Sequence, residues 1–384
     1  MAGLLDLPVE LLLRIVTLLG HDLKLYTDKE RQSDLARLAT TSSALCLVAR
    51  TLLYGDVVNV RSAGRTFLLN RTLAENAELS ALVRHLVAKS EIDFGHPSIV
   101  DLIRNSPNLA SLALSSIYFT KQLSSAALYS ALQAHTQLAS FAYGYRGIDN
   151  DLSPIAPLLQ SWPSLQHLVL DRVEAIPRGE DRSAVHRELR SWGQSPPYRL
   201  SSLSIANVRI PDTFGWPLPA FQWLFGATTT LTSLSLVTFD ALFDLDQLFS
   251  LLSSRGGAKH LEQLLIRDFR DARDPDSSDR APFDPNTLSA YFHSLTHLTL
   301  AENDEESTFV RPAPHFVLPP NLRLLVLYEE LFLDWKLAHT VAAAPPPSFR
   351  KLKVVGPFPT DPDVKLLKHE CEAHGILFEV QRMF

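Results

Sequence analysis

A short pattern of apolar residues recurs along most of the chain. It consists of an apolar residue, two others, a second apolar residue, one other and a third apolar residue. Successive matches lie 26 to 35 residues apart, and a period of this size is typical of an array of similar structural units. Because residues two apart in a strand point to the same face, each match predicts a short strand with one buried face. The central residues of ten full matches are Leu86, Leu112, Phe141, Leu168, Leu203, Leu234, Leu264, Leu298, Leu325 and Leu352.

The segments between these predicted strands carry apolar residues three and four positions apart. Such spacing, present in 99–103, 123–132 and 245–252, is typical of amphipathic helices. A single strand–helix unit cannot bury its own apolar face, so neighbouring units must stack. The sequence therefore predicts an α/β solenoid over residues 61–384, with parallel strands on a concave face and helices on a convex face. With a closing strand at 376–380, it would have about ten to eleven irregular repeats.

The repeats resemble leucine-rich repeats of the irregular type, such as those of ribonuclease inhibitor and of F-box-associated proteins. The asparagine ladder of more regular leucine-rich repeats is mostly missing, because only Asn207 and Asn303 lie near the equivalent place. Longer steps near 175–198 and 268–285 indicate insertions, which often cluster on one face of such arrays. We therefore expect uneven curvature and insertions on one face.

The first sixty residues follow a helical period instead. Asp6 can cap a helix that has Pro8 in its first turn, where a missing N–H costs nothing. An apolar stripe follows through 11–19, and two further apolar faces occupy 35–38 and 45–53. The pattern predicts a bundle of three short helices over residues 1–60. A unit of this size buries little apolar surface, so it usually packs against a neighbour or a partner.

This N-terminal segment resembles an F-box. The match consists of a Leu-Pro-x-Glu-Leu-Leu-x-x-Ile start, an Asp-Leu-x-x-Leu segment at 34–38, and a helix that ends in Leu53-Tyr54 before the valines at 57–58. In that family the unit binds a Skp-type adaptor protein and, through it, a cullin. The other interpretation is that these leucines only form a helical cap for the array. The resemblance implies adaptor contacts at Leu7, Pro8, Leu11, Ile15, Leu35 and Leu38.

Between the buried positions of each predicted strand lie residues that face the concave side. They are small and weakly polar in the middle of the array, and larger and more charged toward the C-terminus. Aromatic residues and arginines are common anchors of protein interfaces. The alternative is a solvated face without a dedicated ligand. The predicted substrate-binding residues are Tyr145, Arg146, Arg172, Arg267, Arg270 and Tyr328.

Composition narrows the classes of partner. With 46% hydrophobic and 20% charged residues, the chain is too apolar to be disordered. A net charge of −6 lacks the positive field that drives phosphate binding, so no nucleic-acid partner is expected. The apolar stretch 4–19 is too short and too charged to span a membrane. Two cysteines make no disulfide framework and suit a reducing compartment, so we expect an intracellular protein of the cytoplasm, the nucleus or both.

No catalytic, cofactor or metal site is expected. The chain has no Gly-x-Ser-x-Gly, no Gly-Lys-Ser phosphate loop, no Gly-x-Gly-x-x-Gly and no His-Glu-x-x-His. His369 and His374 are five residues apart and do not share a helix face, so with Cys371 they make a poor zinc site. By its resemblances, the chain is expected to be the non-enzymatic substrate-recognition adaptor of a Skp–cullin–F-box E3 ubiquitin ligase. A non-catalytic leucine-rich-repeat scaffold with an N-terminal helical cap and no ligase role is the alternative.

Overall fold

The structure is a computed structural model of the 384-residue chain. It describes residues 11, 35, 37–40, 43–55, 57–60, 62–90, 97–116, 126–145, 156–171, 196–206, 223–226, 228–241, 245–271, 286–302, 317–329, 335–356 and 362–381. Contacts within the chain divide it into two units, unit 1 at Met1–Gly147 and unit 2 at Ile148–Phe384. This division falls inside the repeats, and the expected boundary near residue 60 stays a prediction.

Unit 1 alternates strands and helices. Its strands β1 to β4 pair in chain order, and every pair is parallel. The register places Leu86 opposite Leu112, and Leu112 opposite Phe141, so the central residues of successive matches lie side by side. The described elements are α3 (Ser43–Gly55), β1 (Val57–Val60), α4 (Ala63–Glu75), α5 (Ala77–Leu82), β2 (His85–Ser90), α6 (Pro97–Arg104), β3 (Ser111–Ser116), α7 (Ala126–Gln133) and β4 (Ser140–Tyr145).

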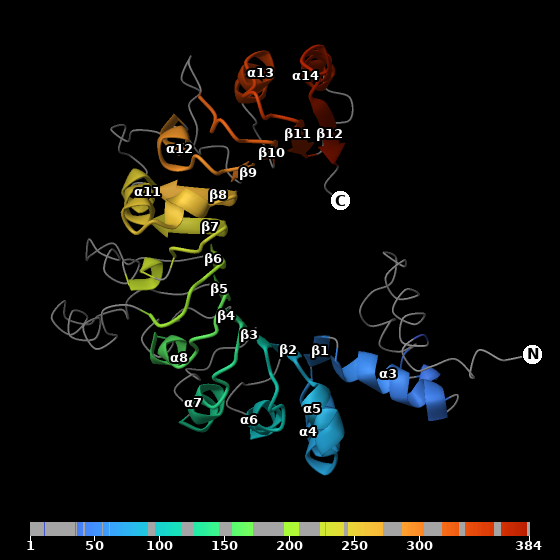
Figure 1. The fold of residues 1–384 in the computed structure, drawn as a ribbon. Coiled ribbons are helices and arrows are strands. Elements are labelled where there is room, and N and C mark those ends of the chain that lie inside the picture. Colours follow the sequence, from blue (N-terminus) through green and yellow to red (C-terminus); the bar gives the residue numbers. More distant parts are fainter. Residues whose placement is uncertain are drawn as a thin grey trace, which may run out of the picture. The chain divides into compact units, whose positions relative to one another are not determined.

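Unit 2 continues the same pattern. Its strands β5 to β12 also pair in chain order and in parallel. Figure 1 shows helices α11 to α14 on one side of these strands. The described elements are α8 (Ala156–Gln160), β5 (His167–Asp171), β6 (Ser202–Ala206), β7 (Ser233–Ala241), α11 (Leu245–Ser254), the 3-10 helix η2 (Gly257–His260), β8 (Gln263–Asp271), α12 (Asn286–Tyr291), β9 (His297–Glu302), β10 (Leu324–Glu329), α13 (Trp335–Ala343), β11 (Lys351–Val355), α14 (Pro362–Ala373) and β12 (Leu377–Gln381).

The apolar residues of the repeats form the core of each unit. In β5 the exposed residues His167 and Val169 alternate with Leu168 and Leu170, which are at most 1% exposed. Apolar side chains of the helices are buried as well, such as Leu248 of α11, which is completely buried. The predicted α/β class and the parallel, sequential strands are therefore confirmed within each unit, and the arrangement is consistent with leucine-rich repeats.

A recurrent turn leads from each helix into the next strand. In most of the repeats the residue three positions before the first apolar residue of a match is buried, and its carbonyl accepts a hydrogen bond from that apolar residue. Leu165 donates to the Trp162 carbonyl in this way at 3.1 Å, and Leu231 to the Thr228 carbonyl at 2.9 Å. The buried residues that accept this bond are Ser80, Ser106, His135, Trp162, Thr228, Phe292 and Pro319.

A ladder of backbone hydrogen bonds joins consecutive repeats where the strands begin. One carbonyl accepts two N–H groups of the next repeat, as the Glu262 carbonyl does from Thr296 and His297, both at 2.9 Å. The hydroxyl of Thr296 donates to the same oxygen at 3.0 Å. The same arrangement occurs earlier in the chain, where the Ser201 carbonyl accepts hydrogen bonds from the N–H and the hydroxyl of Thr232. This ladder joins the repeats without a regular row of asparagines.

Little of the predicted N-terminal bundle is described. The third expected helix is present as α3, which contacts β1 and α5 and buries Val48 and Ala49. The first two expected helices lie mostly outside the described residues, so the three-helix bundle stays a prediction. In the part of the chain that the structure describes, no helix combines the length and the apolar composition needed to cross a membrane.

Candidate functional site

The sheet face of unit 2 is the surface opposite the buried leucines. Strand register arranges its side chains in three rows across β5 to β12. The first row is His167, Ser202, Ser233, Gln263, His297, Leu324, Lys351 and Leu377. The second is Val169, Ser204, Ser235, Leu265, Thr299, Val326, Lys353 and Glu379. The third is Asp171, Ala206, Val237, Arg267, Ala301, Tyr328, Val355 and Gln381.

The chemistry of this face changes along the array. Strands β6 and β7 present only serine, alanine and valine in the three rows. From β8 onward the rows carry long aliphatic, aromatic and charged side chains, among them the half-buried Leu265 and Leu324. The predicted gradient from small to large side chains is therefore present, and β8 to β12 offer the residue types that anchor protein interfaces.

Three charged side chains of β11 and β12 form one cluster. The ammonium group of Lys353 lies 3.6 Å from Oε1 of Glu379, and the ammonium group of Lys351 pairs with Oε2 of the same carboxylate. The hydrogen bond from Lys351 holds the pKa of the Glu379 carboxyl below its ordinary value. One carboxylate thus serves two ammonium groups, and all three side chains are 24% to 41% exposed.

Two of the six predicted substrate-binding residues lie near each other. Arg267 and Tyr328 share the third row, with Ala301 of the intervening strand between them, and both are half-buried. Arg270 lies farther along β8, opposite Asp240. Tyr145 ends β4 in unit 1. Arg146 and Arg172 lie outside the described residues, so the six do not form one described cluster.

The lysine pair and its carboxylate were not among the predicted site residues. Alternating lysines in Lys351-Leu352-Lys353 and the carboxylate of Glu379 in the closing strand were the available signals. Their meaning depends on the register of β11 and β12, which pairs Lys353 with Glu379. Sequence alone did not provide that register.

The predicted adaptor-binding residues are only partly described. Leu11 has helical conformation and is 47% exposed, which suits a contact with a partner. Leu35 is 8% exposed and Leu38 is half-buried. Leu7, Pro8 and Ile15 lie outside the described residues, and adaptor binding stays a prediction.

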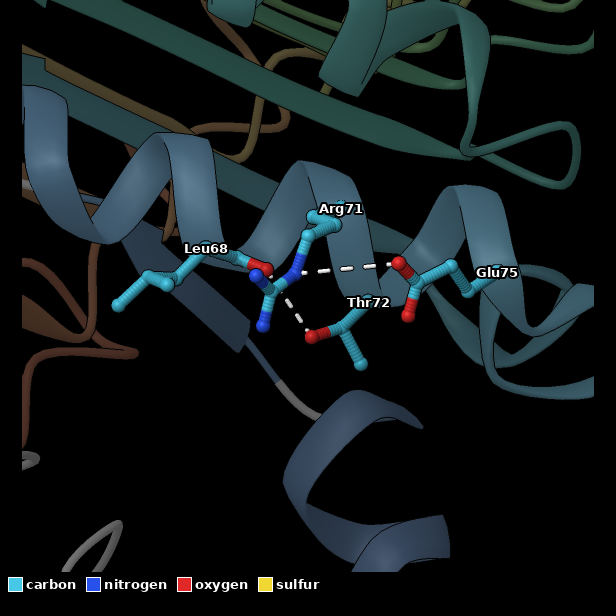
Figure 2. Close-up of polar contacts among 4 residues, drawn as sticks. All are labelled: Leu68, Arg71, Thr72 and Glu75. Carbon is cyan, nitrogen blue, oxygen red and sulfur yellow. Dashed lines mark hydrogen bonds and ion pairs between the residues drawn. The ribbon is translucent and has the colours of Figure 1, made fainter.

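Helix α4 exposes two large apolar side chains. Phe67 and Leu68 are 59% and 54% exposed. Figure 2 shows the polar contacts beside them, where the Thr72 hydroxyl donates to the Leu68 carbonyl at 2.9 Å and the Arg71 guanidinium lies 3.8 Å from the Glu75 carboxylate. Such exposed pairs one helical turn apart stabilise a helix only slightly. They support α4 locally without covering its two apolar side chains.

The described titratable groups include one buried thiol and one histidine–carboxylate pair, all on α13 and α14. Among the residues that the structure describes, no three His, Cys, Asp or Glu side chains lie together as a metal site. Burial, with smaller contributions from Glu370 and Glu372, raises the pKa of the Cys371 thiol to about 11. Such a thiol is protonated near neutral pH and therefore a weak nucleophile. Glu370 itself contacts His339, with 2.6 Å between Oε2 and Nδ1, and so joins α14 to α13.

Comparison with known proteins gives similarity to solved structures but no match by sequence. No family model matches the chain, and no curated protein shows a significant match. The chain is similar to a solved structure described as the crystal structure of Rad7 and Elc1 complex in yeast, with 14% sequence identity and a TM-score of 0.43. The similarity covers 96% of this chain and 91% of that chain. At this level it says nothing about partners or activity.

Proposed function

We propose that the chain is a substrate-recognition adaptor of a Skp–cullin–F-box E3 ubiquitin ligase. Its N-terminal helices would hold the Skp-type adaptor and, through it, the cullin, and the repeat array would hold a protein substrate. The chain itself would carry out no chemistry and would act in the cytoplasm, the nucleus or both. Its contribution would be to keep the substrate near the catalytic subunits.

The observation that carries this proposal is the direct connection between the F-box-like segment and the array. Helix α3, the last helix of the segment, ends at Gly55, and β1, the strand that closes the segment, begins at Val57. Strand β1 pairs in parallel with β2, the first strand of the repeats. Because β1 belongs to residues 1–60 and pairs with β2 of the array, hydrogen bonds between these two strands join the two parts directly. A short, stiff linkage of this kind raises the effective concentration of one bound partner around the other.

A second candidate function rests on the packing of the same helix. Helix α3 contacts β1 and α5, with Val48 and Ala49 at most 1% exposed. Repeat arrays need a terminal unit that shields the apolar end of the stack. Helix α3 could therefore serve as a cap in a pure interaction scaffold without a ligase role.

Binding of a purified Skp-type adaptor discriminates between the two functions. The full-length chain should retain the adaptor in a pull-down, and the double variant Pro8→Ala/Leu11→Ser should retain much less, because both residues belong to the Leu-Pro start. Leu366→Ser is the matched control, since Leu366 on α14 is 52% exposed and Leu11 is 47% exposed. If the unmodified chain retains no adaptor, the ligase role is wrong and the scaffold remains.

A further inference from the structure

We propose that the sheet face over β8 to β12 binds a protein segment in which an acidic residue lies close to an aliphatic residue. The partner's carboxylate would take the place between Lys351 and Lys353 that Glu379 occupies in the free chain. This inference rests on the proposed function, in which the array holds a protein partner. It adds the chemistry by which that partner is selected.

The first argument for an acidic partner is the net charge of the cluster formed by Lys351, Lys353 and Glu379. Lys351 and Lys353 both contact the carboxylate of Glu379, one through each oxygen. Two ammonium groups against one carboxylate leave one positive charge unbalanced. Since the lysine side chains are 32% and 24% exposed, a partner can reach them from solvent. The cluster is therefore complementary to a single negative charge.

The neighbouring strand supplies the apolar part of the surface. The half-buried Leu324 of β10 lies directly opposite Lys351, and the half-buried Leu265 occupies the second row on β8, whereas Val326 opposite Lys353 is buried. Adjacent strands are about 4.8 Å apart, so Leu265 lies about 14 Å from Lys353 across the sheet. An extended partner advances about 3.3 Å per residue. Its acidic residue should therefore follow or precede an aliphatic residue within about four positions.

The same charges favour a carboxylate over a phosphorylated residue. A phosphate carries nearly two negative charges at neutral pH, so together with the two lysines and the displaced Glu379, which stays on the adjacent strand, it would give the cluster a net charge of about −1. The remaining negative charge would lie beside the carboxylate of Glu379. A carboxylate carries one charge and reproduces the contacts that Glu379 already makes with both lysines.

Glu379 acts in this proposal as an internal competitor. An exposed ion pair is weak, because solvent screens it and long side chains lose freedom when they form it. An incoming carboxylate can therefore displace Glu379 at little cost. It follows that removing the Glu379 charge should strengthen binding of an acidic partner, whereas removing the lysine charges should weaken it.

Selection from random peptides tests the predicted chemistry. A phage-displayed library of twelve-residue peptides is selected on the immobilised full-length chain. We expect the recovered peptides to share Asp or Glu within about four positions of Leu, Ile or Val. A library that yields no enriched peptide, or a consensus without an acidic residue, overturns the proposal.

Variants of the cluster then test the location. The affinity of one enriched peptide, labelled with fluorescein, is measured by fluorescence anisotropy. Lys351→Gln/Lys353→Gln should weaken binding about tenfold, and Glu379→Gln should strengthen it about threefold, as expected for exposed ion pairs. Lys365→Gln/Lys368→Gln on α14 removes the same charge from exposed lysines elsewhere in unit 2 and should change nothing.

The outcomes separate clearly. Equal losses in both lysine double variants would show that overall charge governs binding and would overturn the location. Weaker binding by Glu379→Gln, or tighter binding of the peptide when phosphoserine replaces its acidic residue, would overturn the carboxylate assignment. The peptide measurement involves no adaptor, so a chain that fails the adaptor pull-down and still binds acidic peptides would refute the ligase role alone.

Discussion

Truncation of Phe292 to alanine tests whether buried contacts between neighbouring repeats hold unit 2 together. Phe292 follows α12 and is completely buried. Its ring lies edge-to-face against Phe249 of α11, with 4.9 Å between centroids and 83° between the planes. The two residues belong to consecutive helical segments, so the contact joins one repeat to the next. The substitution removes this contact and leaves the backbone hydrogen bond from Leu295 to the Phe292 carbonyl in place.

The expected loss follows from burial and geometry. Replacing a fully buried phenylalanine by alanine typically lowers the free energy of unfolding by about 3–5 kcal/mol, because apolar surface is lost and a cavity remains. An edge-to-face pair contributes about 0.5–1.5 kcal/mol beyond the buried area. Natural domains are stable by about 5–15 kcal/mol. The single truncation should thus remove a large part of the stability of unit 2.

Tryptophan fluorescence in urea measures this loss, because all five tryptophans of the chain lie in unit 2. Phe292→Leu also loses the ring contact but keeps most of the apolar volume, so it serves as the conservative control and should cost clearly less than Phe292→Ala. Leu366→Ala changes an exposed side chain on α14 and should stay within about 0.5 kcal/mol. A loss below about 1 kcal/mol in Phe292→Ala would refute the reasoning that contacts between neighbouring helical segments carry the stability of unit 2.

Three further predictions concern individual groups. Burial lowers the pKa of His135, so on acidification its imidazole is protonated in the unfolded chain before it is protonated in the folded chain. The free energy of unfolding should therefore fall as the pH drops below about 6.5. His135→Gln should flatten that dependence in urea titrations at several pH values. Gly257→Ala should destabilise by about 1–3 kcal/mol in the same assay, since a Cβ would lie 2.7 Å from Oγ1 of the buried Thr228. Iodoacetamide at pH 8 should label the partly exposed Cys46 but not Cys371, whose buried thiol has a pKa raised to about 11; mass spectrometry that finds Cys371 modified in the folded chain would contradict this.

The sequence predicted the strands well because their signal is local. Each match places apolar residues at fixed spacing, and the described central residues of all ten matches lie in parallel strands. Prolines and polar residues predicted turns before several strands, but the buried residue within each turn was not predicted, since it is chemically different from repeat to repeat, as His135, Trp162 and Thr228 show. Their shared feature is a carbonyl that accepts a backbone N–H. The ladder between repeats likewise uses mostly backbone atoms and leaves little trace in residue type.

The candidate site was predicted only in part for a related reason. Arg267 and Tyr328 could be assigned to the same face because each follows its own strand pattern. The cluster of Lys351, Lys353 and Glu379 depends on which residues of β11 and β12 lie opposite each other. That register follows from stacking of complete repeats, which no short window of sequence contains.

Alternation along the strands separates what holds the array together from what it can bind. Leu325 of β10 and Leu352 of β11 are completely buried and support the stacking of neighbouring repeats. Lys351 and Lys353 lie on the opposite face of β11 and contribute only partly exposed ion pairs. Substitutions at distant, independent sites usually have additive effects. Variants of the lysine cluster should therefore change peptide affinity at nearly constant stability, and Phe292→Leu should change stability slightly at constant affinity. This separation is what allows the sheet face of β8 to β12 to carry a specific chemistry while β6 and β7, built on the same core, present only small side chains.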